Sequence, residues 1–343
     1  MKGLRSIEDI FQKEHIEFCS SVKSTLERLP ERALFVVDRN VFDCWSELRE
    51  HIQGKKVYLL DASESKKTLE ETENLYEFLF RHQSVEPLVA IGGGITGDLA
   101  GYASATFKRG IPLILIPTTL LAMCDSTVGG KCGVNFKGVK NYIGTFKKPD
   151  QIFICTEFLD SLPERHLKSG MGEILKYGLI GKEPILQLLE KEDSLRSLHG
   201  RTYVEMGLKI KIEAVSQDFY DQGQRNVLNF GHNIAHGLEA VYPEIFTHGE
   251  AVALGLLAEL KLSEALLGLG SNLRMQTRSI MEKFGMVTAV ADLSVDKLLD
   301  YIKKDKKNDD NLRFTLLREA GCPEIKQSVT EEWIRSAVLE IME

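Results

Sequence analysis

Short apolar runs followed by polar, glycine or proline residues constrain the fold of this chain more than any other feature. Continuous runs of this length are typical of strands that are buried on both faces. Between the second and third runs, residues 68–81 have the apolar spacing of an amphipathic helix. Strand, helix and strand in this order predict a parallel sheet, in which ligands bind at the carboxyl ends of the strands. The predicted strands cover residues 33–37, 56–60, 87–91 and 113–116.

The pattern changes to helices from about Leu159 onward. Residues 251–258 are apolar nearly all round, which indicates a central buried helix. At 343 residues the chain is longer than one hydrophobic core usually supports, so we expect two domains. The predicted fold class is α/β, with a parallel-sheet domain over residues 1–155 and an all-helical domain over residues 156–343. The predicted helices of the second domain are 184–191, 203–215, 233–241, 250–267 and 274–284.

Composition excludes several classes of function. The net charge of -7 argues against a general nucleic-acid binder, because affinity for the phosphate backbone depends on a basic surface. No apolar run is long enough to span a bilayer, and residues 1–9 are too polar for a signal peptide. The six cysteines lack the spacing of a zinc knuckle and are typical of free thiols. We therefore expect a cytoplasmic protein that binds neither nucleic acid nor membrane.

Three of the eight histidines fall in one short stretch, at His232, His236 and His248. Residues four apart project from the same side of a helix, so His232 and His236 could reach a single centre. Catalytic zinc takes three protein ligands and keeps a fourth position open. His248 and the carboxylate of Glu173, in an apolar segment, are candidates for the remaining ligands. A role in capping or packing helices would explain any single histidine, but the clustering favours a metal site.

Residues 92–98, Gly-Gly-Gly-Ile-Thr-Gly-Asp, follow a predicted strand and precede a helix expected to begin near Asp98. Glycines allow a tight turn and let backbone amides approach a pyrophosphate, whose charge a helix amino end favours. The segment does not match the register of the G-x-G-x-x-G dinucleotide motif. An ordinary turn between strand and helix therefore remains an equal alternative.

Glycine-flanked and clustered cationic residues indicate that an anion is bound. Lys131 follows two glycines, and a Lys140-Asn141 pair comes nine residues later, a combination that suits phosphate and hydroxyl groups. Lys211, Arg225 and Asn229 add donors near the histidines, where an arginine could hold a carboxylate or phosphate through two hydrogen bonds. Charge on a solvated helix surface is the alternative for each of these residues.

Seven segments together resemble the 3-dehydroquinate synthase family of the sugar phosphate cyclases. They are GGGITGDLAG, FKRGIPLILIPTTLLA, DSTVGGKCGVN, KNYIGTF, GEILKYGLI, LNFGHNIAH and HGEAVALG. The resemblance runs from about Asp38 to Arg313. It implies an NAD-binding amino-terminal domain, a helical metal-binding domain, an active site in the cleft between them and a homodimer.

The resemblance also implies roles for single residues. The ligands of zinc, or alternatively cobalt, correspond to Glu173, His232 and His248, whereas His236 corresponds to a residue that faces the substrate and not the metal. The substrate positions are Asp125, Lys131, Lys140, Asn141, Lys176, Lys211, Arg225 and Asn229, with Arg109 reaching the substrate phosphate across the dimer interface. The NAD positions are Asp38, Asn40, Glu64, Lys67, Gly93, Gly94, Asp98, Thr118 and Thr119, together with Lys131 and Lys140.

The chain departs from the family pattern at a few positions. Cys132 stands where threonine is common, and residues 218–221 read Asp-Phe-Tyr-Asp where the family usually has two glutamates. The amino terminus lacks the family's opening pair of strands. Residues 305–308 resemble a late lysine motif of the family, and either Lys306 or Lys307 could be the lysine that faces the substrate.

The implied reaction converts 3-deoxy-D-arabino-heptulosonate 7-phosphate to 3-dehydroquinate and phosphate, a step of the shikimate pathway. NAD would take hydride from a ring hydroxyl and return it after phosphate has left, before the carbocycle closes. Zinc would act as a Lewis acid on the reacting alcohol and ketone.

Two alternatives share much of this pattern. One is a sister cyclase acting on sedoheptulose 7-phosphate or glucose 6-phosphate, and the other is a metal-dependent NAD alcohol dehydrogenase, which would release NADH. Lys131, Asn141, Arg225 and Asn229 favour the carboxylate-bearing heptulosonate over the sugar phosphates.

Overall fold

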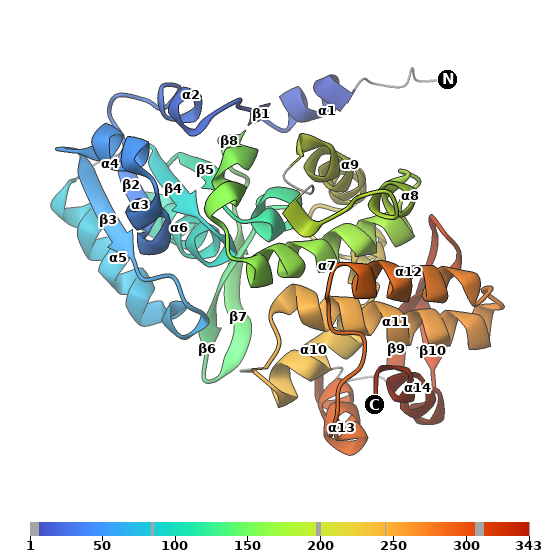
Figure 1. Ribbon diagram of the computed structural model, residues 1–343. Coiled ribbons are helices and arrows are strands. Elements are labelled where there is room, and N and C mark those ends of the chain that lie inside the picture. The colour runs from blue at the N-terminus through green and yellow to red at the C-terminus, as the bar shows by residue number, and fades with distance from the viewer. Residues whose placement is uncertain (1–6, 84–85, 197–199, 244, 306–311, 343) are drawn as a thin grey trace. The chain divides into compact units, whose positions relative to one another are not determined.

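The computed structural model contains two compact units, Met1–Pro163 and Glu164–Glu343 (Figure 1). No helix in the part of the chain that it describes is long and apolar enough to cross a membrane. The described residues are 7–83, 86–196, 200–243, 245–305 and 312–342.

A six-stranded, fully parallel sheet forms the centre of the first unit, in the order β1-β8-β5-β4-β2-β3. The predicted parallel sheet is confirmed, and its four predicted strands correspond to β2, β3, β4 and β5. The two remaining strands, β1 and β8, are only three and four residues long, and no pattern predicted them. The strands are β1 Ile16–Phe18, β2 Leu34–Asp38, β3 Lys56–Leu60, β4 Leu88–Gly92, β5 Leu113–Pro117 and β8 Gln151–Ile154.

The sheet reverses its winding direction between β2 and β4. β3 pairs with one side of β2, whereas β4, the next strand along the chain, pairs with the other side and continues to β5. A reversal of this kind leaves a crevice at the carboxyl ends of the two strands, where ligands bind in open α/β sheets. Asp38 ends β2 and Gly92 ends β4, and a Cβ placed on Gly92 would lie 3.0 Å from the Asp38 Cβ. The two strand ends therefore meet at the switch point.

Helices and one hairpin complete this unit. α5 corresponds to the predicted amphipathic helix, and its start is fixed by Thr68, whose hydroxyl accepts a hydrogen bond from the Glu71 N–H at 3.2 Å. The strands β6 Lys131–Phe136 and β7 Val139–Phe146 form an antiparallel hairpin that contains the predicted Lys-Asn pair. The helices are α1 Ile7–Lys13, α2 Val22–Leu26, α3 Arg39–Cys44, α4 Ser46–Ile52, α5 Leu69–Arg81 and α6 Gly94–Thr106.

The prediction that the helix after the glycine turn begins near Asp98 was wrong. α6 begins at Gly94, and Gly93 is its extended N-cap residue. Glycine has a low intrinsic helix propensity, which is why the pattern placed the start later. Tertiary contacts override that propensity here, because a Cβ on Gly92 would meet the Thr96 hydroxyl at 2.4 Å and one on Gly93 would meet Thr119 at 3.0 Å.

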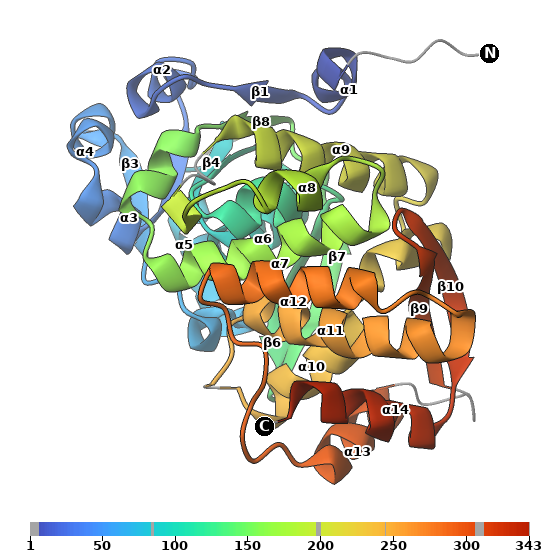
Figure 2. The same ribbon diagram turned by 45° about the vertical axis from the view of Figure 1, so that its right-hand side comes forward.

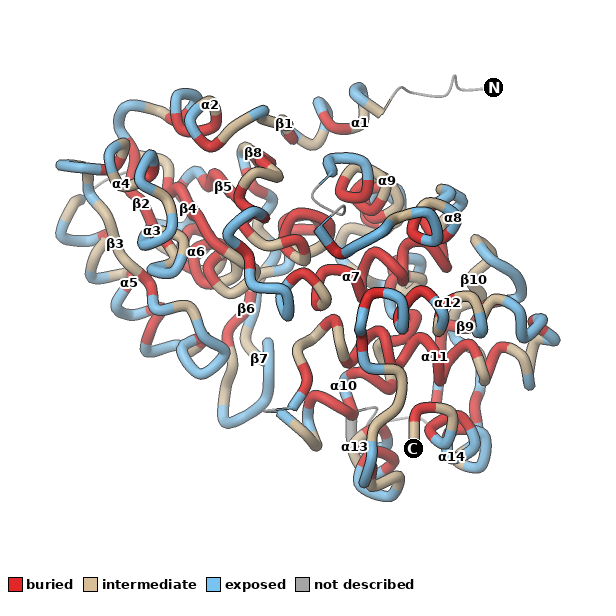
Figure 3. Tube along the Cα trace, viewed as in Figure 1, coloured by how far each residue is buried: buried red, intermediate tan, exposed pale blue. Residues whose placement is uncertain are grey.

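The second unit consists mainly of helices packed around α11. All of residues 251–260 are buried, so the predicted central buried helix is confirmed, as the burial colouring along α11 shows (Figure 3). α11 contacts α7, α10, α12 and α14 (Figure 2). The helices are α7 Glu164–Ile180, α8 Ile185–Leu189, α9 Arg201–Gln217, α10 His232–Val241, α11 His248–Leu267, α12 Asn272–Lys283, α13 Val295–Asp305 and α14 Glu331–Val338.

The second unit is not helical throughout. β9 Leu312–Glu319 and β10 Cys322–Val329 form an antiparallel hairpin, with β9 packed against α11. The buried run at residues 314–317 is too short for periodicity to distinguish a strand from a buried helix, so the pattern gave no strand. The predicted fold class, a parallel-sheet domain followed by a helical one, is otherwise confirmed.

Candidate functional site

Glu173, His232 and His248 come together in the second unit from three different helices. Glu173 lies in the middle of α7, while His232 and His248 are the first residues of α10 and α11. Glu173 Oε1 is 3.2 Å from His248 Nε2 and 3.4 Å from His232 Nε2. One ligand atom from each of the three residues lies within 4.8 Å of the others. We call these three residues the triad.

Local sequence features place two of the triad residues. A capping box fixes the start of α11 at His248, because the Thr247 hydroxyl accepts from the Glu250 N–H and the Glu250 carboxylate accepts from the Thr247 N–H at 2.8 Å. A Cβ on Gly172 would lie 2.1 Å from the Gly249 carbonyl oxygen. The glycines that adjoin Glu173 and His248 in the sequence therefore let the backbones of α7 and α11 touch beside the triad.

The donor set and spacing of the triad fit a zinc ion. Two ligands about 2.0–2.1 Å from one tetrahedral centre are separated by roughly 3.3 Å. The distances from Glu173 Oε1 to the two histidine nitrogens are 3.2 and 3.4 Å. Two histidines and one carboxylate also leave one tetrahedral position for water or substrate.

Glu173 is a fully buried carboxylate that is held in its charged form. Its Oε2 forms an ion pair with Lys176, one turn further along α7. Burial disfavours the charge, but the Lys176 ammonium and hydrogen bonds from His232 and His248 outweigh it and keep the pKa of Glu173 well below its usual range. The site therefore presents an anion to a metal ion at neutral pH.

Glu239 orients the imidazole of His248. Its Oε2 lies 3.2 Å from His248 Nδ1, so the ring donates from Nδ1 and keeps Nε2 toward Glu173. Metal-bound histidines commonly donate their second nitrogen to a carboxylate in this way. Burial alone would lower the pKa of His248, but hydrogen bonds to Glu173 and Glu239 raise it to about 10. A metal ion that binds here must displace a proton from His248.

His236 is not part of the triad. It lies one turn after His232 on α10, is exposed, and its ring centroid is 5.6 Å from that of His232. Among the described residues, the potential ligand group contains Glu173 instead. The shared helical face of His232 and His236 is real, but only the first points its Nε2 at the carboxylate.

The predicted cationic residues of the second unit are buried. Lys176, Lys211 and Arg225 are 2, 5 and 5% exposed, whereas Asn229 is exposed. Arg225 is held by a loop in which its Nη1 donates to the Phe219 carbonyl at 2.8 Å. Buried cations are costly unless anions or acceptors surround them, so their position is more than a solvated helix surface.

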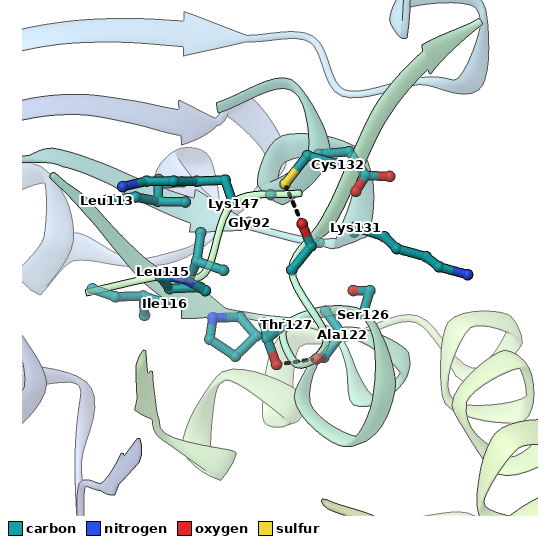
Figure 4. Close-up of a pocket in the computed structure, with 18 residues that line it drawn as sticks. Gly92, Leu113, Leu115, Ile116, Ala122, Ser126, Thr127, Lys131, Cys132 and Lys147 are labelled. Atoms are coloured by element: carbon teal, nitrogen blue, oxygen red, sulfur yellow. Dashed lines mark hydrogen bonds between the residues drawn. The ribbon is translucent and has the colours of Figure 1, made fainter. Parts of the chain in front are cut away.

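A pocket in the first unit surrounds the glycine turn (Figure 4). Of the predicted NAD residues, Gly93, Gly94, Asp98 and Lys131 line it. Among the described residues, the buried hydroxyl of Thr118 at the end of β5 has no hydrogen-bond partner. Such a group is costly to leave unsatisfied, and it fits a dinucleotide that supplies the missing partner.

Cys132 also lines this pocket, and its position explains the departure from threonine. A Cβ on Gly101 would lie 2.3 Å from its sulfur, so the thiol packs directly against α6. Its Sγ donates to the Gly130 carbonyl at 3.5 Å (Figure 4). Burial raises the pKa of the Cys132 thiol to about 12, so it serves packing and not nucleophilic chemistry.

The other predicted NAD residues form a continuous set along the strand ends. Asp38 Oδ1 accepts from the Asn40 N–H at 2.9 Å, and a Cβ on Gly93 would touch Thr119. The buried Lys67 ammonium pairs with Asp98 and donates to Asn141 Oδ1. Lys67 thus joins the glycine turn to the β6–β7 hairpin.

Some predicted residues are not drawn into these groups by the contacts described. Arg109 is exposed in the 3-10 turn after α6, with a left-handed φ of 67°. Glu64 contacts Asn135 on β6 at 2.8 Å, while Asp125 lies in a π-helical turn and Lys140 is exposed on β7. Lys306 and Lys307 lie outside the described residues.

Sequence reasoning missed Glu239. The available signal was that Glu239 is the carboxylate of the helix that carries His232, and a metal-binding histidine generally needs a carboxylate partner. Which histidine it serves depends on the packing of α10 against α11, which no spacing along the chain reveals.

Two family models match consecutive parts of the chain. The model described as 3-dehydroquinate synthase N-terminal matches residues 57–169, and the one described as 3-dehydroquinate synthase C-terminal matches residues 170–308. A 3-dehydroquinate synthase of Clostridium tetani (strain Massachusetts / E88) is 40% identical over 89% of this chain and 84% of that protein. The chain belongs to the 3-dehydroquinate synthase family. The resemblance predicted from the sequence segments is confirmed.

Solved structures of related cyclases share the fold. A 2-deoxy-scyllo-inosose synthase complexed with carbaglucose-6-phosphate, NAD+ and Co2+ is 26% identical, with a TM-score of 0.85, over 95% of this chain and 96% of that one. A 2-epi-5-epi-valiolone synthase from Streptomyces hygroscopicus subsp. jinggangensis 5008, with NAD+ and Zn2+ bound, is 25% identical over the same shares, also with a TM-score of 0.85.

Proposed function

We propose that this member of the 3-dehydroquinate synthase family converts 3-deoxy-D-arabino-heptulosonate 7-phosphate to 3-dehydroquinate and phosphate, with NAD and a divalent metal ion. The observation that carries the proposal is the triad, since a family member that had lost this chemistry would have no reason to keep it. Curated synthases are up to 40% identical to the chain, whereas the two cyclase structures above are 25 and 26% identical. This difference supports the heptulosonate over the substrates of the sister cyclases.

Glu173, His232 and His248 would hold the metal, which supplies Lewis acidity to a reacting alcohol and ketone, and the glycine turn would hold NAD, which supplies reversible hydride transfer. Glu173 contributes the negative charge of the site. Glu239 holds His248 so that its Nε2 faces inward. Gly93 and Gly94, at the amino end of α6, offer backbone N–H groups to a pyrophosphate.

Lys176, Lys211 and Arg225 would bind the anionic groups of the substrate. All three are buried in the second unit, where a charge-assisted contact is stronger than at the surface. Three cations are more than one phosphate requires, which supports a second anionic group such as a carboxylate. Removing the guanidinium of Arg225 should cost about 2 to 5 kcal/mol of transition-state stabilisation.

Substrate competition tests the proposal. The purified protein, loaded with zinc or cobalt and NAD, is offered the heptulosonate, sedoheptulose 7-phosphate and glucose 6-phosphate separately, while phosphate release and NADH absorbance are followed. We expect phosphate release from the heptulosonate without net NADH. Faster turnover of either sugar phosphate would indicate a sister cyclase, and accumulation of NADH would indicate an alcohol dehydrogenase.

Other features remain proposals that this assay does not address. They are functional domains at 1–155 and 156–343, a homodimer in which Arg109 reaches the partner's substrate, a cytoplasmic location, and the substrate roles of Asp125, Lys131, Lys140, Asn141, Asn229 and His236.

A further inference from the structure

Glu259 is a second fully buried carboxylate close to the triad, and the proposed reaction gives it no role. It lies three turns along α11 from His248 and has no solvent exposure. Its Oε2 accepts a hydrogen bond from the Gly231 N–H at 2.7 Å, and its Oε1 accepts from the Asn233 and Ile234 N–H groups at 3.1 and 3.4 Å. One side chain of α11 thus binds three backbone amides that flank His232.

These amides form the amino-terminal turn of α10, which its own sequence leaves uncapped. Gly231 is the N-cap residue and has no side chain to accept from the first turn. The first N–H groups of a helix lack partners within the helix and also carry partial positive charge. A buried carboxylate satisfies both the hydrogen bonds and the charge, and a buried amide without an acceptor would be costly.

Close backbone packing makes the arrangement specific. A Cβ on Gly255, one turn before Glu259, would lie 2.0 Å from the Gly231 carbonyl oxygen. Gly231 itself has a left-handed φ of 83°, and a Cβ there would meet Leu256 at 2.7 Å. The start of α10 therefore rests directly on the α11 backbone, at the height where the Glu259 carboxylate is available.

The turn that Glu259 holds carries the imidazole of His232. The ring is oriented at two atoms, since Nδ1 lies 3.2 Å from the Phe230 carbonyl oxygen and Nε2 lies 3.4 Å from Glu173 Oε1. Both the Phe230 carbonyl and the His232 backbone belong to the segment next to the amides that Glu259 binds. A rotation of this turn would move Nε2 away from the other two ligand atoms.

We propose that Glu259 is a positioning residue for metal binding: it fixes the first turn of α10 so that His232 presents Nε2 to the ion held by Glu173 and His248. This inference rests on the proposed metal site. It extends that site to a carboxylate that contacts neither the ion nor the substrate and acts only through the backbone of α10.

The test compares Glu259→Gln with Glu264→Gln in the full-length protein. Gln keeps the shape of the side chain but removes the charge and turns a donor toward one of the amides. Glu264 is a matched control, because it lies on the same helix, is mostly buried, and pairs with Arg274 at 2.7 Å and Lys261 at 3.4 Å. Metal-free protein is titrated with Co²⁺ by calorimetry, and the visible absorption of the bound ion is recorded.

Loss of a residue that supports a metal ligand typically lowers metal affinity about 10- to 100-fold. We expect a loss of this size and a changed Co²⁺ absorption spectrum for Glu259→Gln, and affinity within twofold of wild type for Glu264→Gln. Both variants should lower the melting temperature, so stability alone does not separate the two roles. Wild-type affinity and an unchanged spectrum in Glu259→Gln would overturn the proposal.

A conservative variant covers the case in which Glu259→Gln does not fold. Glu259→Asp keeps the charge on a shorter arm, and a folded Asp variant must show the same direction of change in affinity and spectrum. If neither variant folds, Glu259 serves the fold as a whole and the proposal is wrong. If wild-type protein binds neither Co²⁺ nor Zn²⁺, the metal site itself is wrong, whereas equal affinities in wild type and variant contradict the role of Glu259 alone.

Discussion

The glycine turn after β4 and the triad in the second unit offer their binding groups by opposite means. The turn exposes backbone: Gly92, Gly93 and Gly94 follow one another in the chain and line one pocket. The triad exposes side chains from α7, α10 and α11, which are separated by up to 75 residues in sequence. Its charges are buried and surrounded by further charged groups, including Lys176 and Glu239.

The difference determines how each region can be damaged. A backbone site fails when a side chain is added, because the added atoms occupy space that the ligand needs. A side-chain site fails when a group is removed or its charge changes, because a buried partner is left uncompensated. The two regions should therefore respond to different substitutions, and each response can be measured without the other.

The largest effect should come from deleting a triad residue. Glu173→Ala, His232→Ala and His248→Ala should each abolish stable metal binding and activity, because two ligands hold zinc poorly. His236→Ala should keep the metal and lose rate. Metal analysis of the four purified variants, with NAD affinity measured as a control for the first unit, checks this. Full zinc occupancy in His248→Ala would contradict the assignment of the triad.

A smaller effect should follow from changing the support of a ligand. Glu239→Gln weakens the acceptor for His248 Nδ1 and should reduce metal affinity about 10- to 100-fold. Because it also removes one of the two carboxylates beside His248, the pKa of this imidazole should fall. Titration with Zn²⁺ at two pH values measures both changes. If affinity stays at the wild-type level at both, Glu239 does not orient the ligand.

Metal affinity should also depend on pH through His248. With a pKa of about 10 in the metal-free fold, the imidazole must lose a proton on binding, so apparent affinity should rise with pH up to about 10. The slope should be about tenfold per pH unit for one proton. The sign is opposite for the stability of the metal-free protein. Protonated His248 stabilises that fold fully below pH 6.5, and this contribution is lost as the pH rises toward 10.

Calorimetric titrations from pH 7 to 9, repeated in buffers of different ionisation enthalpy, count the proton released. Binding without proton release over this range would show that His248 is already neutral.

The smallest effect should come from adding atoms to the glycine turn. In Gly94→Val the new Cβ lies 3.3 Å from the Ser126 hydroxyl, at the pocket edge where backbone must approach a pyrophosphate. We expect NAD affinity to fall at least about tenfold, roughly 1.4 kcal/mol, with metal binding unchanged. Gly270→Val is the control, since an added Cβ there meets nothing within 4 Å. Unchanged NAD affinity in Gly94→Val would place the cofactor elsewhere.

The same contrast separates what could be predicted from what could not. The parallel sheet, the helix at 69–81 and the buried α11 follow from periodicity, which is a local property of the chain. The strand β8 and the hairpin β9–β10 are short or ambiguous in pattern, and pairing with distant strands or packing on α11 decides them. The start of α6 was placed too late because glycine propensity is local, whereas contacts with Thr96 and Thr119 are not.

For the site, the sequence by itself determined the residue types: three histidines, a carboxylate in an apolar segment, glycines after a strand, and a family resemblance that names their roles. Tertiary structure alone decided which of these side chains meet. It brought Glu173 to His232 and His248, excluded His236 from that group, and supplied Glu239 and Glu259 as partners from facing helices. The physical reason is that a ligand set needs atoms within a few ångströms, and the contacts between α7, α10 and α11 that produce this proximity depend on shapes along whole helices, such as the paired glycines at 172 and 249.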